Sequence, residues 1–193
     1  MRQLRCFVAI ELEDDIREAI RRTQALLKVA QAGKYGRWVR PEGIHLTLKF
    51  LGDVPENRVE LIADAIRQAA TDRAPFPLFF GKLGCFPNLR APRVTWVGVD
   101  DPSGDLRRLQ RDVETNLSDL GYPPEKRAFH PHLTLARTRR VTRGEQAALG
   151  ELVRRTHLDR LGEMEVAEVS LMRSELQPSG SVYTQLAAAP LGG

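Results

Sequence analysis

The tetrapeptide His-Leu-Thr-Leu occurs twice in the sequence, at residues 45–48 and at residues 132–135. Imidazole is the side chain whose ordinary pKa lies nearest neutrality, so one histidine can accept a proton while a second one donates a proton. Threonine hydroxyls can donate hydrogen bonds to the non-bridging oxygens of a phosphoryl group. The repeated His-x-Thr therefore indicates acid–base catalysis at phosphorus, a scheme that requires no metal ion and no cofactor.

A single His-x-Thr on a strand is most often an ordinary polar face, because motifs this short arise easily by chance. Here the motif is repeated, and both copies fall on predicted strands. Alternation along a strand puts His45 and Thr47 on one face and the two leucines on the other, and the same holds for His132 and Thr134. We therefore predict His45 and His132 as catalytic residues, and Thr47 and Thr134 as substrate-binding residues.

The elements that must position these motifs follow from apolar periodicity. Strands are expected at residues 4–11, 44–51, 76–85, 93–99, 132–138, 165–176 and 181–187. Helices are expected at residues 14–31, 55–71, 101–120 and 145–155. Each half thus has the order strand, helix, histidine strand, helix, which predicts two similar lobes with the active site in the cleft between them. No Ser/Gly/Pro-rich linker separates the halves, so residues 1–193 are expected to form a single bilobal domain.

Length and composition fit a folded globular protein, since 42% of the 193 residues are hydrophobic and 28% are charged. No apolar run approaches the ~20 residues of a membrane helix, and the first residues lack a signal-peptide cleavage pattern, so we expect a cytoplasmic protein without membrane contact. Cys6 and Cys85 lie in apolar segments without metal-ligand spacing. They are expected to be buried free thiols.

The protein is basic, with a net charge of +4 and a pI of about 9.4, and arginine far outnumbers lysine. Guanidinium groups bind phosphate in a bidentate manner, which favours a phosphorylated substrate or nucleic acid. Surface ion pairing and genome composition explain an arginine-rich surface equally well.

Three segments extend the pattern beyond the tetrapeptides: FVAIEL near the start, RWVRPEGIHLTLKFLGDV around the first motif and RAFHPHLTLAR around the second. With these segments the sequence resembles the two-histidine phosphoesterases, in particular the RNA 2',3'-cyclic phosphodiesterases, also described as the 2'-5' RNA ligase family. The resemblance implies an α+β fold with a duplicated β-α-β-α-β arrangement, in which antiparallel sheets flank a central basic cleft. It also implies hydrolysis of a terminal 2',3'-cyclic phosphate of RNA to a 2'-phosphomonoester.

The same resemblance implies roles for individual residues. His45 corresponds to the usual proton donor and His132 to the acceptor, although two identical motifs do not reveal this polarity. Arg137 matches the family pattern as a phosphate contact, but strict alternation puts it on the leucine face, so a bulge or a strand end is needed. Phe129 is predicted to stack on the terminal base, with Trp38 as a further candidate. Phe50 is expected to pack in the core instead, because its alternation matches that of the motif leucines.

Three alternatives remain at this point. A metallohydrolase could bind zinc through His45, His130 and His132, but such sites usually add carboxylate or thiolate ligands, and none adjoins either motif. A non-catalytic module that binds RNA ends would explain the arginines but not the paired His/Thr faces. Within the enzyme interpretation, the reverse reaction would join a 2',3'-cyclic end to a 5'-hydroxyl.

We expect a monomer that acts on RNA ends or oligonucleotides.

Overall fold

The computed structural model of the protein describes residues 2–178 and 180–192. The strands are β1 (Gln3–Ile10), β2 (Gly36–Trp38), β3 (Leu46–Pro55), β4 (Phe76–Phe86), β5 (Val94–Asp100), β6 (His132–Thr138), β7 (Gly162–Val166), β8 (Glu168–Gln177) and β9 (Gly180–Pro190). The α-helices are α1 (Asp14–Val29), α2 (Val59–Ala70), α3 (Asp105–Asp119) and α4 (Arg143–Arg155). Short 3-10 helices occupy Gln31–Tyr35, Pro41–Gly43 and Glu56–Arg58.

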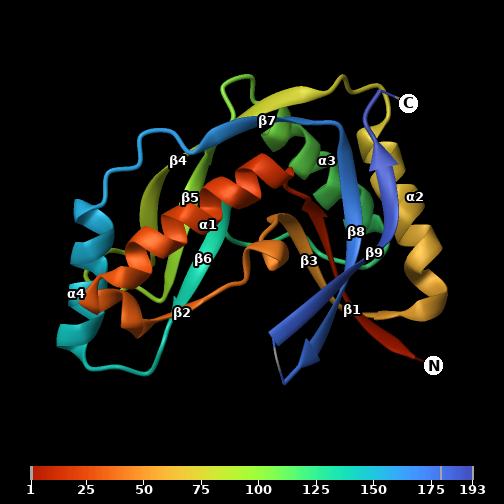
Figure 1. Ribbon diagram of the computed structural model, residues 1–193. Coiled ribbons are helices and arrows are strands. Elements are labelled where there is room, and N and C mark those ends of the chain that lie inside the picture. The colour runs from red at the N-terminus through yellow and green to blue at the C-terminus, as the bar shows by residue number, and fades with distance from the viewer. Residues whose placement is uncertain (1, 179, 193) are drawn as a thin grey trace.

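The strands form two antiparallel sheets (Figure 1). Sheet A has the order β3-β1-β8-β9, and sheet B has the order β2-β6-β5-β4-β7. The first histidine motif therefore adjoins the edge strand of sheet A, and the second lies one strand inside the edge of sheet B. The fold class expected from the sequence, α+β with duplicated halves and antiparallel sheets, is confirmed.

The two halves of the chain exchange elements. Strand β1 of the first half pairs with β8 of the second half, and β5 of the second half pairs with β4 of the first half. The helices cross over as well: α1 lies against sheet B, whereas α2 and α3 pack beside sheet A (Figure 1). Because each sheet contains strands of both halves, neither half could complete a sheet alone.

Strand β1 illustrates how alternation separates the core from the cleft. Its even-numbered residues, Leu4 to Ile10, are buried in the main hydrophobic core beneath the helices. Phe7 and Ala9 point to the other face, where they form a small separate cluster with Met172 and Tyr183. This second cluster supports the residues of the cleft.

Most of the expected elements are present with small shifts at their ends, but three differ. The strand expected at residues 165–176 is two strands, β7 in sheet B and β8 in sheet A, because the chain passes between the sheets at Ala167. The apolar pattern changes phase at this break: Met164 and Val166 are buried in β7 and Val169 and Leu171 in β8, with the exposed residues 167 and 168 between them. Strand β3 continues beyond Leu51 through Gly52, whose φ of 71° only glycine adopts readily. Strand β2 was not expected within its polar segment.

Cys6 and Cys85 are buried free thiols, as predicted. His157 is exposed. None of the helices in the described part of the chain is long and apolar enough to cross a membrane.

Candidate active site

The two motif strands lie beside each other where the two sheets meet. Strands β3 and β6 make direct contacts, although they belong to different sheets (Figure 1). His45 directly precedes β3, and His132 is the first residue of β6. Thr47 and Thr134 are half-buried on the same strand face as their histidines, while the motif leucines are buried in the core. The fold therefore brings the two motifs together, as the duplication predicts.

Each motif strand contains a β-bulge at the same position of its tetrapeptide. In β3, Ala9 pairs with Thr47 and Val8 with Lys49, so Leu48 is the extra residue. In β6, Trp96 pairs with Thr134 and Thr95 with Ala136, so Leu135 is the extra residue. A bulge inserts one residue and reverses the alternation beyond it. The residues that follow therefore change faces.

This reversal decides the position of two residues. Arg137 lies on the same strand face as His132 and Thr134, because the bulge at Leu135 reverses the alternation. A contact between Arg137 and a bound phosphate requires this position. The prediction that Phe50 packs in the core was wrong, because the bulge at Leu48 turns its side chain outward and leaves it 62% exposed. Phe50 instead lies near Phe7, with 6.1 Å between the ring centroids.

A buried glutamine stabilises each bulge from the helix of the opposite half. The Gln24 amide of α1 donates to the Leu135 carbonyl at 3.1 Å, and the Gln110 amide of α3 donates to the Leu48 carbonyl at 3.4 Å. A buried carbonyl without a partner would destabilise the fold by roughly 1–3 kcal/mol. The crossed helices thus stabilise the local geometry on which the cleft depends.

His45 lies in an aromatic environment. Its ring stacks on Phe7, with 4.5 Å between the centroids, and Tyr183 approaches edge-on at 5.0 Å. The pKa of His45 is lowered from 6.5 to about 4, mainly by burial and to a smaller extent by the positive charge of Arg17, against an opposing hydrogen bond to the Gly43 carbonyl. The His45 imidazole is therefore neutral at pH 7 in the ligand-free protein.

His132 has a comparable but less extreme environment. Phe86 contacts its ring edge-on at 4.9 Å, and Trp96 lies at 6.5 Å. Nδ1 lies 2.6 Å from the His130 carbonyl, which accepts only, so Nδ1 carries a proton and Nε2 has a free lone pair in the neutral ring. Burial lowers the pKa of His132, and the positive charge of Arg137 adds to this effect. The carbonyl two residues earlier thus fixes the tautomer of His132.

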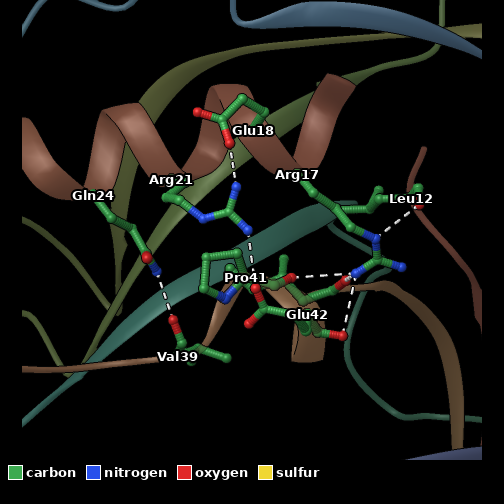
Figure 2. Close-up of polar contacts among 9 residues, drawn as sticks. Leu12, Arg17, Glu18, Arg21, Gln24, Val39, Pro41 and Glu42 are labelled. Carbon is green, nitrogen blue, oxygen red and sulfur yellow. Dashed lines mark hydrogen bonds and ion pairs between the residues drawn. The ribbon is translucent and has the colours of Figure 1, made fainter. Parts of the chain in front are cut away.

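The loop before His45 is attached to the start of α1 (Figure 2). The Arg17 guanidinium donates to the carbonyls of Leu12 at 3.0 Å and of Pro41 and Glu42 at 3.2 Å. Arg21 also reaches this loop, where it donates to the Glu42 carboxylate at 2.9 Å. These contacts hold the backbone that presents His45 at the edge of sheet A.

Two cavities adjoin the motifs. One has a volume of about 480 Å³ and is lined by His132 together with Phe86, Trp96, Lys82 and Arg107. The other has a volume of about 610 Å³ and is lined by residues of β2, the following loop, β6 and the β8–β9 hairpin. Tyr183, the edge-on neighbour of His45, belongs to the second cavity. His132 therefore lines an aromatic cavity, and Tyr183, which contacts His45, lines an arginine-rich one.

The structure does not bring every predicted residue to this group. The Phe129 side chain packs against the main core and lines neither cavity, and Trp38 also packs partly against the core while lining the second cavity. Phe7, Phe86, Trp96 and Tyr183, which do contact the histidines, were not predicted. Their strands were predicted correctly, but the pairing between strands that brings them to the histidines has no local signal in the sequence.

The zinc alternative required His45, His130 and His132 to converge. Within residues 2–178 and 180–192, no three His, Cys, Asp or Glu side chains lie in an arrangement that could hold a metal ion. His130 contributes its carbonyl to the Nδ1 contact of His132, and its ring lies 6.3 Å from Phe86. The described residues therefore offer no ligand set for the zinc interpretation.

Comparison with known proteins places this geometry in a family. The pattern of the LigT-like phosphoesterases matches the chain twice, at residues 10–96 and at residues 97–183, so each match contains one His-Leu-Thr-Leu motif. The chain belongs to the LigT-like phosphoesterase family. The double match agrees with the duplication expected from the repeated motif.

Individual relatives of this LigT-like chain cover almost its whole length. It is 37% identical over 184 residues to an RNA 2',3'-cyclic phosphodiesterase of Methanothermobacter thermautotrophicus, with 95% of this chain and 97% of the relative covered. A second RNA 2',3'-cyclic phosphodiesterase, from Archaeoglobus fulgidus, is 35% identical over 95% of this chain and 98% of its own length.

Solved structures agree with the LigT-like assignment. The protein TT0787 of Thermus thermophilus superposes with a TM-score of 0.81 at 30% identity, with 98% of this chain and 99% of that chain covered. LigT of E. coli, solved in complex with 3'-AMP, superposes with a TM-score of 0.78 at 27% identity over the full length of both chains.

Proposed function

We propose that this protein hydrolyses the 2',3'-cyclic phosphate at an RNA end to a 2'-phosphomonoester, with His45 and His132 as its acid–base pair and without a metal ion. The observation that carries this proposal is the contact between the two strands with identical His-Leu-Thr-Leu motifs, one from each sheet. The names of the relatives support the same substrate. We further propose that residues 1–193 act as one domain and as a monomer, since one chain supplies both motifs. We also propose that the protein acts in the cytoplasm.

The reaction needs one proton acceptor and one proton donor on opposite sides of the phosphorus. Water loses a proton to the neutral base while its oxygen forms the new P–O bond, the P–O3' bond breaks, and the acid protonates the departing O3'. We assign the acceptor role to His132, whose Nε2 has a free lone pair in the neutral ring. His45 is then the donor, and because burial leaves it neutral in the free protein, it takes up its proton when the phosphodiester anion binds beside it. Thr47, Thr134 and Arg137 hold the non-bridging oxygens, where negative charge accumulates in the transition state. Phe129, whose side chain packs against the core, has no contact with the substrate in this proposal.

The lowered pKa values predict the pH dependence. The active free enzyme carries one proton on the pair, and this form dominates only between the two pKa values, both of which lie below 6.5. We therefore expect kcat/KM for a cyclic mononucleotide to reach its maximum on the acidic side of pH 6.5 and to fall as the pH rises through 7. The profile of kcat should lie at higher pH, because the phosphodiester anion stabilises the histidine cation in the complex.

Initial-rate measurements between pH 3.5 and 9 would provide both profiles, with circular dichroism at each pH to verify that the protein stays folded. A kcat/KM profile that still rises above pH 7 would contradict the conclusion that burial lowers the pKa values of both histidines.

The reaction itself is tested by product analysis. The protein, dialysed against EDTA, is incubated with an oligoribonucleotide that ends in a 2',3'-cyclic phosphate, and ³¹P NMR then identifies the product. We expect undiminished turnover and a 2'-phosphomonoester as the only product. Formation of a 3'-phosphomonoester, or activity only after zinc or manganese is added, would contradict the proposal.

A further inference from the structure

The larger cavity carries more positive charge than hydrolysis of the terminal phosphate requires. Its lining includes Arg37 of β2, Arg40 of the following loop and Arg137 of β6. Arg37, Arg40 and Arg137 form no ion pair with any carboxylate of the described residues, whereas Glu42, the acidic residue of the lining, is paired with Arg21. Three arginines without counterions beside one cavity indicate an anionic ligand.

Two of these arginines are held directly opposite each other. Arg37 pairs with Arg137 across the β2–β6 ladder, and both side chains are exposed. Like charges directly opposite on neighbouring strands repel each other and destabilise the pair. The arrangement persists in a strand of only three residues. An anion between the two guanidinium groups would convert this repulsion into attraction.

The opposite wall of the cavity is the β8–β9 hairpin. Leu176 and Val182 are 75% and 40% exposed there, and Tyr183 leads from this wall to His45. Exposed apolar side chains opposite a row of arginines suit a ligand with alternating charged and flat apolar parts. A nucleic acid strand has this composition, with phosphates on one side and bases on the other.

The chemistry of a terminal nucleotide determines which part of the strand reaches this cavity. When the cyclic phosphate lies between the histidines, the ribose still carries the base at C1' and the rest of the chain at C5'. The aromatic cavity beside His132 suits the base, with Phe86 and Trp96 as its stacking surfaces. The RNA chain attached at C5' then enters the arginine-rich cavity.

We propose that Arg37 and Arg40, beside Arg137, form a subsite for the internucleotide phosphate immediately 5' of the terminal nucleotide. The preferred substrate is then an RNA strand with at least two nucleotides and not a cyclic mononucleotide. This inference rests on the proposed hydrolysis, because it assigns the neighbour of the phosphate that is attacked.

The test compares three substrates with the same terminal base: a 2',3'-cyclic mononucleotide, a dinucleotide with the same cyclic end, and that dinucleotide with a neutral methylphosphonate in place of its internucleotide phosphate. Arg37→Gln should lower kcat/KM for the natural dinucleotide about tenfold, because a charge-assisted hydrogen bond is lost. It should leave kcat/KM for the other two substrates unchanged within about twofold. Arg40→Gln should have the same pattern, and Arg111→Gln, an exposed arginine of α3 that lines neither cavity, is the matched control.

The outcomes separate this inference from the function on which it rests. Equal losses on the dinucleotide and the mononucleotide, or no loss on either, would overturn the subsite and leave hydrolysis intact. Failure of the wild-type protein on all three substrates would remove the proposed hydrolysis, and the subsite with it. If Arg37→Gln relieves inhibition by added ATP but leaves dinucleotide turnover unchanged, the cavity binds free nucleotide phosphates, and the inference is wrong.

The melting temperature provides a test that does not depend on catalytic activity. Because Arg37 and Arg137 repel each other in the free protein, Arg37→Gln should not lower the melting temperature. Inorganic sulfate should raise the melting temperature of the wild type more than that of Arg37→Gln. A destabilised variant with an unchanged response to sulfate would mean that Arg37 has a structural role only.

Discussion

Substitution of either motif histidine should abolish most of the activity. We expect His45→Ala and His132→Ala each to lower kcat on a cyclic-ended oligonucleotide by about 10²–10⁴-fold, the usual effect of losing a general acid or base. KM should change little, because neither substitution removes the arginines or the threonines that hold the phosphate. Single-turnover rates on the same substrate would measure this loss.

The threonines provide the matched comparison. Thr47→Ala and Thr134→Ala each remove one hydrogen bond to the phosphoryl group and leave proton transfer in place, so their losses should be smaller. His157→Ala, at an exposed position that lines neither cavity, should have no effect. A histidine variant that is as active as the wild type, with an unchanged circular dichroism spectrum, would exclude the paired mechanism.

The second large effect concerns the stability of the first bulge. Directly after Leu48, the Lys49 side chain is only 1% exposed, forms an ion pair with Glu114 of α3, and donates to the Pro123 carbonyl at 2.8 Å. Lys49→Met would leave the Glu114 carboxylate without its counterion at a site where that carboxylate is 11% exposed. We expect the free energy of unfolding to fall by about 3–5 kcal/mol, as when one partner of a buried ion pair is removed.

Urea denaturation followed by circular dichroism would measure this change, with Lys126→Met at an exposed position as the control. The double variant Lys49→Met/Glu114→Leu should regain most of the lost stability, because no unpaired charge remains buried. A loss below about 1 kcal/mol for Lys49→Met would mean that water reaches the Glu114 carboxylate.

The features that could be predicted from the sequence were those that produce a regular spacing of apolar residues along the chain. Alternation in β1 and β6 and helical spacing in α1 and α3 define which face of each element is apolar, so the element order and the faces of His45 and His132 could be derived. Duplication then implied that the two motifs meet. Exchange of β4 and β8 between the halves had no such signal, because an antiparallel partner is chosen by long-range pairing.

The bulges were the main features that a period could not predict. A bulge reverses alternation at one residue, which is why Phe50 was assigned to the wrong face and why Arg137 required a special explanation. One signal was present in the sequence. Gln24 and Gln110 each interrupt the apolar face of a helix, and a buried polar residue at such a place needs a hydrogen-bond partner. The carbonyls of Leu135 and Leu48 are those partners.

The most direct test of the central claim, that His45 and His132 act on one transition state, is the activity of the double variant His45→Ala/His132→Ala relative to the two single variants. If both histidines transfer protons in the same step, the double variant should be only slightly slower than the slower single variant, because either loss alone already disables the pair. A loss in kcat equal to the product of the two single losses would mean that the histidines contribute independently, and it would contradict the paired mechanism.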